Sequence, residues 1–443
     1  MRDRGSQAGF SDVTVRRRDI LRSTGAIGIA GLAGCTGDGD NDGDGGMSTT
    51  QGQDDDMPDS MTFGMIVPLS GPYGTMGQGN QNGMALAVEQ INASDEVLPD
   101  TTLDFIVEDS KTDPETAVQV ARELVLQENV DILYGSVAGS VSIALADFAA
   151  RENIPHIPIS STGSLTIGEE CRFTSVRWSM HDIAMAGQTA TFGPEQFGDT
   201  TYSVFPDYSY GQRTQAKAQE LYEANDITDY GNKRAPLGQQ EWGTFLDEIR
   251  SEEPDYIHMA MAGSGATAFM SQAVNYGLDI PIVGQYLTPR VLGGITQEQF
   301  DALPEIYTAT IHWTREVDHE DTRSYVETFK KQYNRPPDTM TYYGWMYAHA
   351  FSQLLEKVGT LDTQAMMKGA ADWTFDTNMK GEVFSRACDH QGEGVAYSAK
   401  MVGPSTPETD GMAQMEIIGE WDTAEWMPAC EDTPCPNDDW PVK

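Results

Sequence analysis

Basic side chains are scarce in this sequence. Its 443 residues include 28 lysines and arginines against 68 aspartates and glutamates, a formal net charge of −40 at pH 7. Nucleic acids bind basic surfaces that neutralise phosphates, so this balance argues against a nucleic-acid partner. So acidic a surface repels itself unless salt screens the charges. We interpret the charge as an adaptation to a very salty exterior, and a solvated acidic face on a mesophilic protein is the alternative.

The N-terminal segment lacks an apolar run long enough to span a bilayer, which takes about 20 residues. A short apolar run, 23–33, follows the pair Arg17-Arg18 and leads into Leu-Ala-Gly and then Cys35. This order predicts a twin-arginine lipoprotein signal peptide over 1–34, with Cys35 as the lipidated first residue of the mature chain. The protein is then extracytoplasmic, lipid-anchored to the outer face of the cytoplasmic membrane. The alternative is a basic N-terminal tail with a buried helix.

Residues 35–60 lack an apolar cluster and contain eight aspartates. Such a composition predicts a disordered acidic linker, extended by charge repulsion. Asp38, Asp40 and Asp42 match the start of a calcium loop, but Thr49 stands where the closing carboxylate belongs. The linker interpretation is therefore favoured.

Cysteines are few: the chain has five, and without Cys35 an even number remains, as is common in an oxidising compartment. Cys430 and Cys435 lie five residues apart, which suggests a local disulfide loop and leaves Cys171 and Cys388 for a long-range bridge. Four cysteines permit three pairings, and free thiols stay open.

Catalytic and metal-binding signatures are absent from the sequence. It contains no G-x-S-x-G elbow and no H-E-x-x-H motif, and its seven histidines show no ligand spacing. We therefore expect no enzyme, no catalytic residue, no metal and no cofactor, although a site assembled from distant residues stays open. Residues 263–268 fit G-x-G-x-x-A, but Gly284, Gln285 and Tyr286 end the next strand without the carboxylate that binds a ribose. We interpret this loop as a tight turn beside a cleft, with nucleotide binding as the alternative.

Strands and helices alternate along two stretches of the chain. The first begins with the strand 61–67, followed by a helix over 79–93, and ends with the strand 156–159; the second runs from the strand 202–205 to 280–283. Alternation predicts parallel sheets joined by right-handed crossovers, and two series imply two lobes. Further expected elements are a strand at 306–311, helices at 321–333 and 339–358, and strands near 382–387, 395–402 and 416–418. Their late return suggests that the chain passes between the lobes more than once.

Polar turns follow strands in both series, at the sheet edge where α/β proteins bind ligands. They are residues 68–73, 135–140 and 160–163 in the first series and 207–211, 263–264 and 285–286 in the second. Free N–H groups at a helix start, together with serine and tyrosine hydroxyls, suit a carboxylate, an amide or another small polar ligand.

These turns lie in segments that resemble the type I periplasmic-type solute-binding proteins of ABC importers, above all the branched-chain amino acid and amide/urea receptors. The segments are TFGMIVPLSGPYGTMGQGNQNGMALAVEQINA, DSKTDPETAVQVARELVLQENVDILYGSVAGSVSIALADFAARENIPHIPISS, PDYSYGQ, PLGQQEW, NYGLDIPIVG, FKKQYNRPPDTMTYYGWMYAHA and RACDHQ. The resemblance implies an α/β clamshell of two lobes, each a parallel-sheet sandwich, with three hinge crossovers. It implies a small-molecule ligand in the cleft and partners in an ABC permease and its ATPase. The lobes would be 61–175 plus 306–387, and 176–305 plus 388–443, in a monomer.

The resemblance also implies ligand-binding residues in both lobes. They are Ser70, Tyr73, Met76, Gly139, Ser140, Ser161 and Thr162 in the first lobe and Tyr210, Gly263, Gln285 and Tyr286 in the second. Amino-acid receptors of this family carry an acidic residue after the strand ending at Gly284, where this chain has Gln285 and Tyr286. A buried ammonium without a counter-charge is costly, so an amide, a urea-like compound or a short carboxylate fits as well as a branched-chain amino acid. Asp207 is the alternative counter-charge.

The family often carries cysteines at the places of Cys171 and Cys388, which favours a bridge between these two near the hinge. Asn92-Ala93-Ser94 is a glycosylation sequon. We predict an extracytoplasmic receptor of an ABC importer. The alternatives are a sensory receptor of the same fold and an extracytoplasmic enzyme acting on a small amide.

Overall fold

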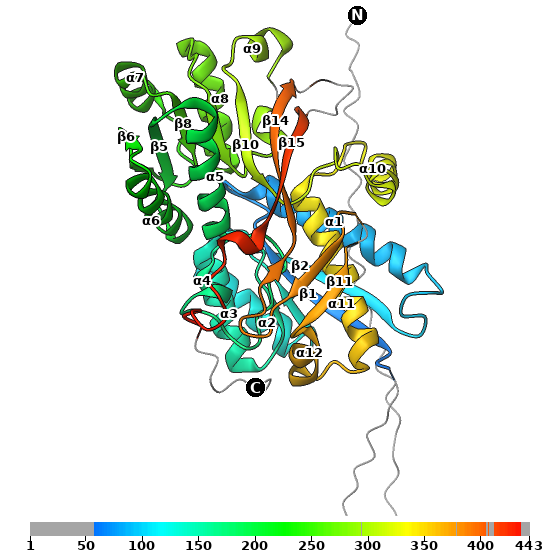
Figure 1. Cartoon of the computed structure of the whole chain (residues 1–443). Coiled ribbons are helices and arrows are strands. Elements are labelled where there is room, and N and C mark those ends of the chain that lie inside the picture. The colour runs from blue at the N-terminus through cyan, green and yellow to red at the C-terminus, as the bar shows by residue number, and fades with distance from the viewer. Residues whose placement is uncertain (1–56, 294, 378, 405, 407–411, 436–443) are drawn as a thin grey trace, which may run out of the picture. The chain divides into compact units, whose positions relative to one another are not determined.

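The computed structural model describes residues 57–435 except 294, 378, 405 and 407–411 (Figure 1). The predicted signal peptide, the predicted lipidation site Cys35 and nearly all of the predicted acidic linker lie outside the described residues. In the part of the chain that the structure describes, no helix is both long and apolar enough to cross a membrane.

Four parallel strands form the first sheet, in the order β2-β1-β3-β4. They are β1 (Ser60–Val67), β2 (Thr102–Asp109), β3 (Ile132–Tyr134) and β4 (His156–Ile157), connected by α1 (Gly74–Asn92), α2 (Pro114–Leu126) and α3 (Gly139–Glu152). Local sequence defines the start of α2 well. The Asp113 side chain accepts a hydrogen bond from the Thr116 N–H, and Pro114 occupies the first turn, so α2 begins where its cap and proline predict.

The second sheet has the order β15-β14-β10-β9-β8-β5-β6, with β7 paired to β5. Its strands are β5 (Thr200–Pro206), β6 (Thr228–Asp229), β7 (Lys233–Ala235), β8 (Tyr256–Met259), β9 (Ile282–Gln285), β10 (Ile306–Ile311), β14 (Val395–Gly403) and β15 (Gln414–Asp422). Its helices are α5 (Asp182–Phe197), α6 (Ser209–Ala224), α7 (Gly243–Glu252), α8 (Gly263–Tyr276), the 3-10 turn η1 (Pro289–Leu292) and α9 (Gln297–Asp301). The strands from β5 to β10 run parallel, whereas β14 is antiparallel to β10 and to β15.

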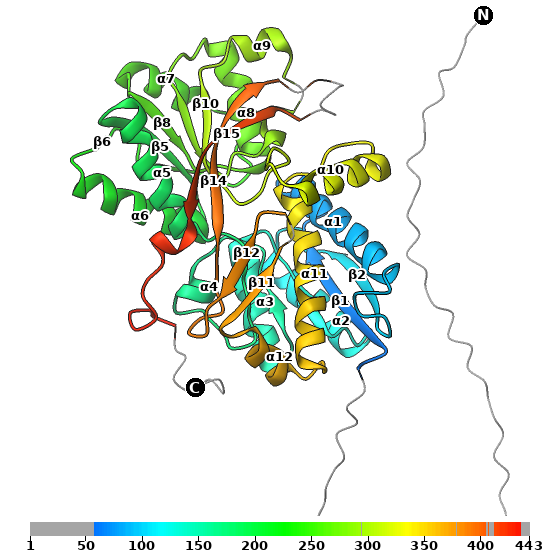
Figure 2. The same cartoon turned by 45° about the vertical axis from the view of Figure 1, so that its right-hand side comes forward.

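The chain then returns to the first sheet, where α11 packs along α1 (Figure 2). The returning elements are α10 (Glu320–Tyr333), α11 (Thr339–Val358), α12 (Thr363–Ala370) and a small antiparallel sheet of β11 (Trp373–Asp376), β12 (Glu382–Ser385) and β13 (Gly392–Glu393). The short helix α4 (Ser164–Ile167) lies earlier in the chain, after β4. We call the first sheet with its helices the first lobe, and the second sheet with its helices the second lobe. The predicted α/β class with parallel sheets is confirmed.

One predicted boundary is wrong. We placed 306–311 in the first lobe, but β10 pairs with β9, with Ile306 opposite Ile282, and so belongs to the second sheet. The sequence of a strand does not show which sheet it joins, because that depends on the strand with which it pairs elsewhere in the chain. The chain therefore leaves the second lobe after β10, and the other lobe boundaries stay predictions.

Buried hydrogen bonds join two segments that run between the lobes, one around Arg177 and the other around Gln391. Arg177 is fully buried, and its guanidinium donates to the Gln391 side-chain oxygen at 2.6 and 2.8 Å. It also donates to the Thr162 carbonyl at 2.5 Å and to the Thr166 hydroxyl at 2.7 Å. A buried charge needs such complete hydrogen bonding, so this network fixes the path of the chain between the lobes.

The disulfide pairing differs from our prediction. Cys171 bonds Cys435 and Cys388 bonds Cys430, with Cα–Cα separations of 5.6 and 5.7 Å. The segment after β15 runs along the crossover that contains Cys388, where the Arg386 guanidinium donates to the Pro428 carbonyl at 2.9 Å. The two cysteines of this C-terminal segment, Cys430 and Cys435, are thus bonded to two different parts of the chain. Both the proposed Cys430–Cys435 loop and the proposed Cys171–Cys388 bridge are wrong.

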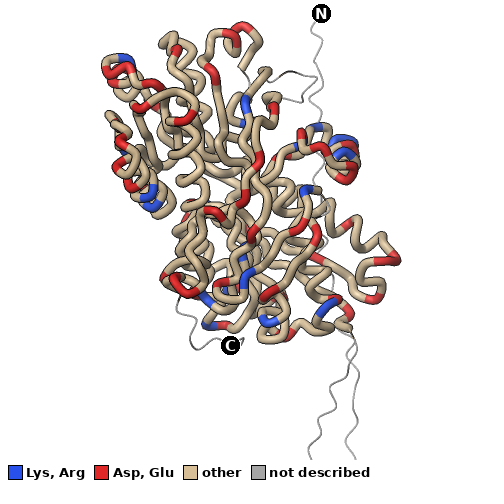
Figure 3. The backbone as a smooth tube through the Cα atoms, viewed as in Figure 1, with Lys and Arg blue, Asp and Glu red and all other residues tan. Residues whose placement is uncertain are grey.

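Acidic residues are distributed along both lobes (Figure 3), as expected of a sequence with 68 acidic and 28 basic residues. The charge excess is therefore not confined to one lobe of the described chain.

Candidate functional site

The two lobes meet at the helix starts that follow their parallel strands. Gly263 opens α8 at a φ of +61°, and a Cβ added there would lie 2.5 Å from the Pro72 carbonyl oxygen of the first lobe. The Ser264 N–H donates to that same carbonyl at 3.3 Å. Nearby, the hydroxyls of Tyr73 and Tyr208 form a hydrogen bond of 2.6 Å between the lobes. The structure therefore represents a conformation in which the lobes are closed on each other.

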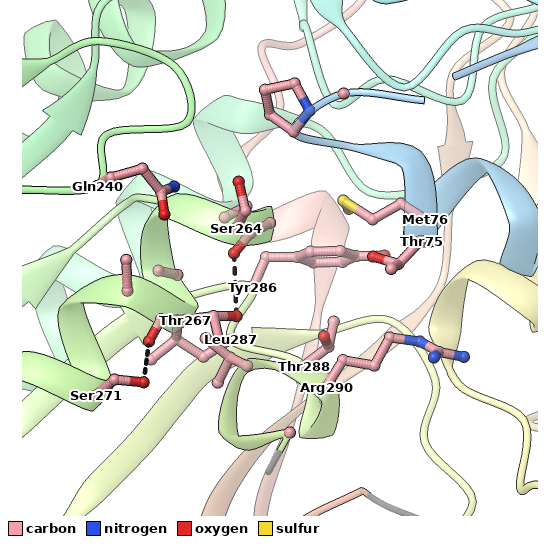
Figure 4. Close-up of a pocket in the computed structure, with 18 residues that line it drawn as sticks. Thr75, Met76, Gln240, Ser264, Thr267, Ser271, Tyr286, Leu287, Thr288 and Arg290 are labelled. Carbon is pink, nitrogen blue, oxygen red and sulfur yellow. Dashed lines mark hydrogen bonds between the residues drawn. The ribbon is translucent and has the colours of Figure 1, made fainter. Parts of the chain in front are cut away.

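A cavity of about 580 Å³ opens beside this contact (Figure 4). Its walls come from four places: the turn before α1 and the first residues of that helix, from Gly71 to Met76; Gln240, which precedes α7; the first turns of α8; and the segment from Tyr286 to Gly293 after β9. Small-molecule sites typically measure about 300–1,000 Å³, so this outer cavity has a suitable size.

A smaller inner cavity of about 40 Å³ adjoins the outer one, since Met76, Ala262 and Tyr286 line both. Its lining is dominated by aromatic rings and thioethers. These belong to Tyr73, Tyr208, Tyr210, Tyr286, Tyr343, Met76, Met180, Met185 and Met340. Such groups pack against the apolar or aromatic body of a ligand, and the tyrosine hydroxyls can donate to a polar group on that ligand. Burial raises the pKa of Tyr73 to about 12, so its hydroxyl keeps its proton at neutral pH.

No acidic side chain is found among the described residues that line the cavities, although the sequence has 68 acidic residues. Among the described residues that line either cavity, Arg290 is the one with a charge. A ligand ammonium would find no carboxylate there, whereas a ligand carboxylate would meet no repulsion from the walls.

Four helices begin at this contact without a capping side chain or an acidic first turn. They are α1, α3, α6 and α8, whose cap residues are Tyr73, Ala138, Tyr208 and Ala262. By contrast, Asp113, Asp338 and Asp362 cap α2, α11 and α12. Uncapped N-termini present positive dipole ends, which favours an anionic or carbonyl-bearing ligand, although at α8 the Ser264 N–H already donates to the Pro72 carbonyl.

The structure brings six of the eleven predicted ligand residues to the cavities. These are Tyr73, Met76, Ser161, Tyr210, Gly263 and Tyr286. Their ligand roles stay predictions.

The other five predicted residues do not line either cavity. Ser70 donates to the Asp109 carboxylate at 2.7 Å, and Ser140 is exposed on α3. Gly139 is buried where an added Cβ would lie 1.9 Å from the Thr162 hydroxyl, and Thr162 is itself fully buried. Gln285, also fully buried, ends β9. Tyr286 follows the end of β9 with a φ of +59° and reaches both cavities, whereas Gln285 lines neither.

Sequence reasoning missed several lining residues. Tyr208 lies in the PDYSYGQ turn that we identified, but we carried over only Tyr210 from it. Met340 and Tyr343 come from α11, far along the chain, and no local signal marks them for the cleft. Arg290 follows the Gln285-Tyr286 turn, and only the folded path of η1 shows that it reaches the outer cavity.

Comparison with known proteins matches residues 60–406 to the family model described as "Periplasmic binding protein". The chain belongs to this family. A curated relative is the leucine-, isoleucine-, valine-, threonine- and alanine-binding protein of Pseudomonas aeruginosa, 22% identical over 72% of this chain and 84% of that protein.

Solved structures share the fold of this periplasmic binding protein family member. A periplasmic binding protein from Burkholderia mallei has a TM-score of 0.75 at 17% identity, covering 85% of this chain and 99% of that one. A solute-binding protein of an ABC transporter from Rhodopseudomonas palustris, in complex with 3,4-dihydroxybenzoic acid, has a TM-score of 0.71 at 18% identity, covering 83% and 98%. The predicted family, two-lobed fold and role as a small-solute receptor are confirmed.

Proposed function

We propose that this receptor serves an ABC importer and binds a small carboxylate with an apolar or aromatic body. The observation that carries the proposal is the composition of the cleft: tyrosine rings, methionine thioethers and uncapped helix starts, with no acidic side chain among the described lining residues. A carboxylate is favoured near the positive ends of these helices, while its body packs against the rings.

The related fold from Rhodopseudomonas palustris, in complex with 3,4-dihydroxybenzoic acid, supports this ligand class, because that molecule joins an aromatic ring to a carboxylate. The second candidate is a branched-chain amino acid, which the name of the Pseudomonas aeruginosa relative favours. Against it stands the ammonium group, which would be desolvated in the cleft without a counter-charge.

A titration in high salt tests the proposal with benzoate, benzamide and leucine. We expect benzoate to raise the melting temperature most, because of the three compounds it is the one that joins an aromatic body to a carboxylate without an ammonium group. A ligand specific to the folded state adds about 2.7 kcal/mol of stability at a hundred times its Kd. Recovery of the solute unchanged, measured by chromatography, supports a receptor over an amide-consuming enzyme. A larger shift with leucine than with benzoate would reject the carboxylate class.

The location is part of the same proposal. We propose export through the twin-arginine signal, anchoring through Cys35, a monomeric receptor and delivery to a permease and its ATPase. The order of motifs in residues 17–35 supports the anchor. Release of a Cys35→Ser variant from the membrane fraction, with the unaltered protein retained, is the expected result.

A further inference from the structure

Arg290 stands out as the charged side chain of the cleft. It lies on η1 of the second lobe, and its Nε pairs with the carboxylate of Asp338, the cap residue of α11 in the first lobe. The Asp338 side chain is 1% exposed and that of Arg290 is 24% exposed. This ion pair therefore joins the two lobes at the wall of the outer cavity.

The first lobe holds Asp338 in place independently of Arg290. Its Oδ1 accepts from the Thr341 N–H at 3.0 Å, and its own N–H donates to the Thr341 hydroxyl at 2.7 Å. Burial alone would raise the pKa of Asp338, but Arg290, Arg335 and the Thr341 N–H together hold it below the usual value. The carboxylate is therefore a fixed, charged anchor for the Arg290 guanidinium.

One nitrogen of that guanidinium, Arg290 Nη2, is buried and has no hydrogen-bond partner. A buried N–H of a charged group that lacks an acceptor costs free energy, and a guanidinium presents donors in a fork that matches a carboxylate. Figure 4 shows Arg290 and Tyr286 extending in the same direction from one wall of the outer cavity. A ligand anion there would supply the missing acceptor.

We propose that Arg290 is the specificity-determining residue of the cleft, donating from its free nitrogen to the anionic group of the ligand while Asp338 fixes its orientation. This inference rests on the proposed carboxylate class and adds that the Arg290 side chain recognises the negative charge of the ligand. Because the guanidinium bridges both lobes, it reaches this position only when they are closed, and recognition of the anion is coupled to closure.

The test compares benzoate with benzamide, which has nearly the same shape and no charge, by calorimetric titration of the exported protein in high salt. We expect Arg290→Gln to weaken benzoate binding by about tenfold to a hundredfold, the range for a hydrogen bond to a charged group. Benzamide binding should change less than about threefold on the same scale. Arg290→Lys keeps the charge without the fork, and we expect a smaller loss for benzoate.

Arg323→Gln is the matched control: Arg323 on α10 forms an exposed ion pair with Asp318, which precedes that helix, so the change should alter neither affinity. Equal losses for benzoate and benzamide in both Arg290 variants would overturn the inference, as would no loss at all. If Arg290→Gln does not fold, Arg290→Lys alone decides between these outcomes. An unaltered protein that binds neither compound would instead overturn the proposed ligand class.

Discussion

Gly263 is the residue through which closure of the lobes is most directly testable. Its φ of +61° lies in the left-handed region, and the space for a side chain is filled by the Pro72 carbonyl and the Tyr73 ring of the other lobe. A Cβ at this position therefore obstructs the closed conformation specifically, because the opposing atoms belong to a lobe that moves away on opening.

We expect Gly263→Ala to weaken ligand binding by about tenfold or more, because closure must overcome a backbone clash. Gly277→Ala is the control: Gly277 ends the same helix at a φ of +59°, and nothing lies within 4 Å of an added Cβ. Both variants incur the cost of a left-handed alanine, of order 1 kcal/mol, so they should unfold similarly. Calorimetric titration checks the affinities, and equal binding by the two variants would contradict a closed bound state.

At the scale of elements, α1 shows how tertiary packing overrides local propensity. We expected a helix only from residue 79, because the glycine-rich residues before it look unfavourable for a helix. In the structure α1 already begins at Gly74. Two glycines of this helix leave no room for a side chain: a Cβ on Gly77 would lie 1.8 Å from the Pro68 carbonyl oxygen, and one on Gly83 would lie 1.8 Å from the Thr341 carbonyl oxygen of α11. The helix therefore forms because α11 packs closely against it.

We expect Gly83→Ala to destabilise the protein by about 2 kcal/mol or more, although alanine is the better helix former, because the clash pushes α1 from α11. Gln78→Ala on the exposed side of the same helix should change stability by less than about 0.5 kcal/mol. Chemical unfolding in constant salt measures both. A Gly83→Ala variant as stable as the unaltered protein would show that the helices can separate without cost.

Other elements show where sequence reasoning succeeds and where it stops. The bounds of α2 and α11 follow from a capping aspartate and an apolar pattern, which are local signals. We predicted no helix over α5, which contains Pro194 and glycines at 187 and 193. Those glycines admit the Trp426 and Tyr256 rings, which come from distant segments. Local patterns thus define most strands and helices, and partners far along the chain determine the rest.

The same division holds for the cleft. Turns at the carboxyl ends of parallel strands share one sheet edge, so Tyr73, Gly263 and Tyr286 could be placed there from sequence. Tyr343 and Arg290 could not, because their positions depend on how a later helix and a short turn fold back. The identity of a disulfide partner is equally non-local, and it has a consequence for the molecule as a whole.

At the scale of the whole molecule, the segment after β15 acts as a further covalent connection between the lobes. It leaves the second lobe at the 3-10 turn η3 (Thr423–Trp426), which packs on α5, and Cys430 joins it to the crossover at Cys388. Cys435 then bonds Cys171, which follows α4 of the first lobe. The bridge closes a separation of 264 residues, so it limits both the unfolded chain and the opening of the lobes.

Removing this bridge should therefore affect stability and opening together. For the variant Cys171→Ser with Cys435→Ser, we expect a loss of unfolding free energy of about 2–4 kcal/mol and a larger radius of gyration without ligand, measured by X-ray scattering. A ligand that closes the lobes should bring the radius back to that of the unaltered protein, because the cleft residues are unchanged. The variant Cys388→Ser with Cys430→Ser removes a bridge that spans only 42 residues. This variant keeps Cys435 attached to Cys171 of the first lobe, so its radius of gyration should change less. Equal radii for the two variants would show that the tail does not restrain the lobes, even if both lose stability, since stability alone follows from any lost crosslink.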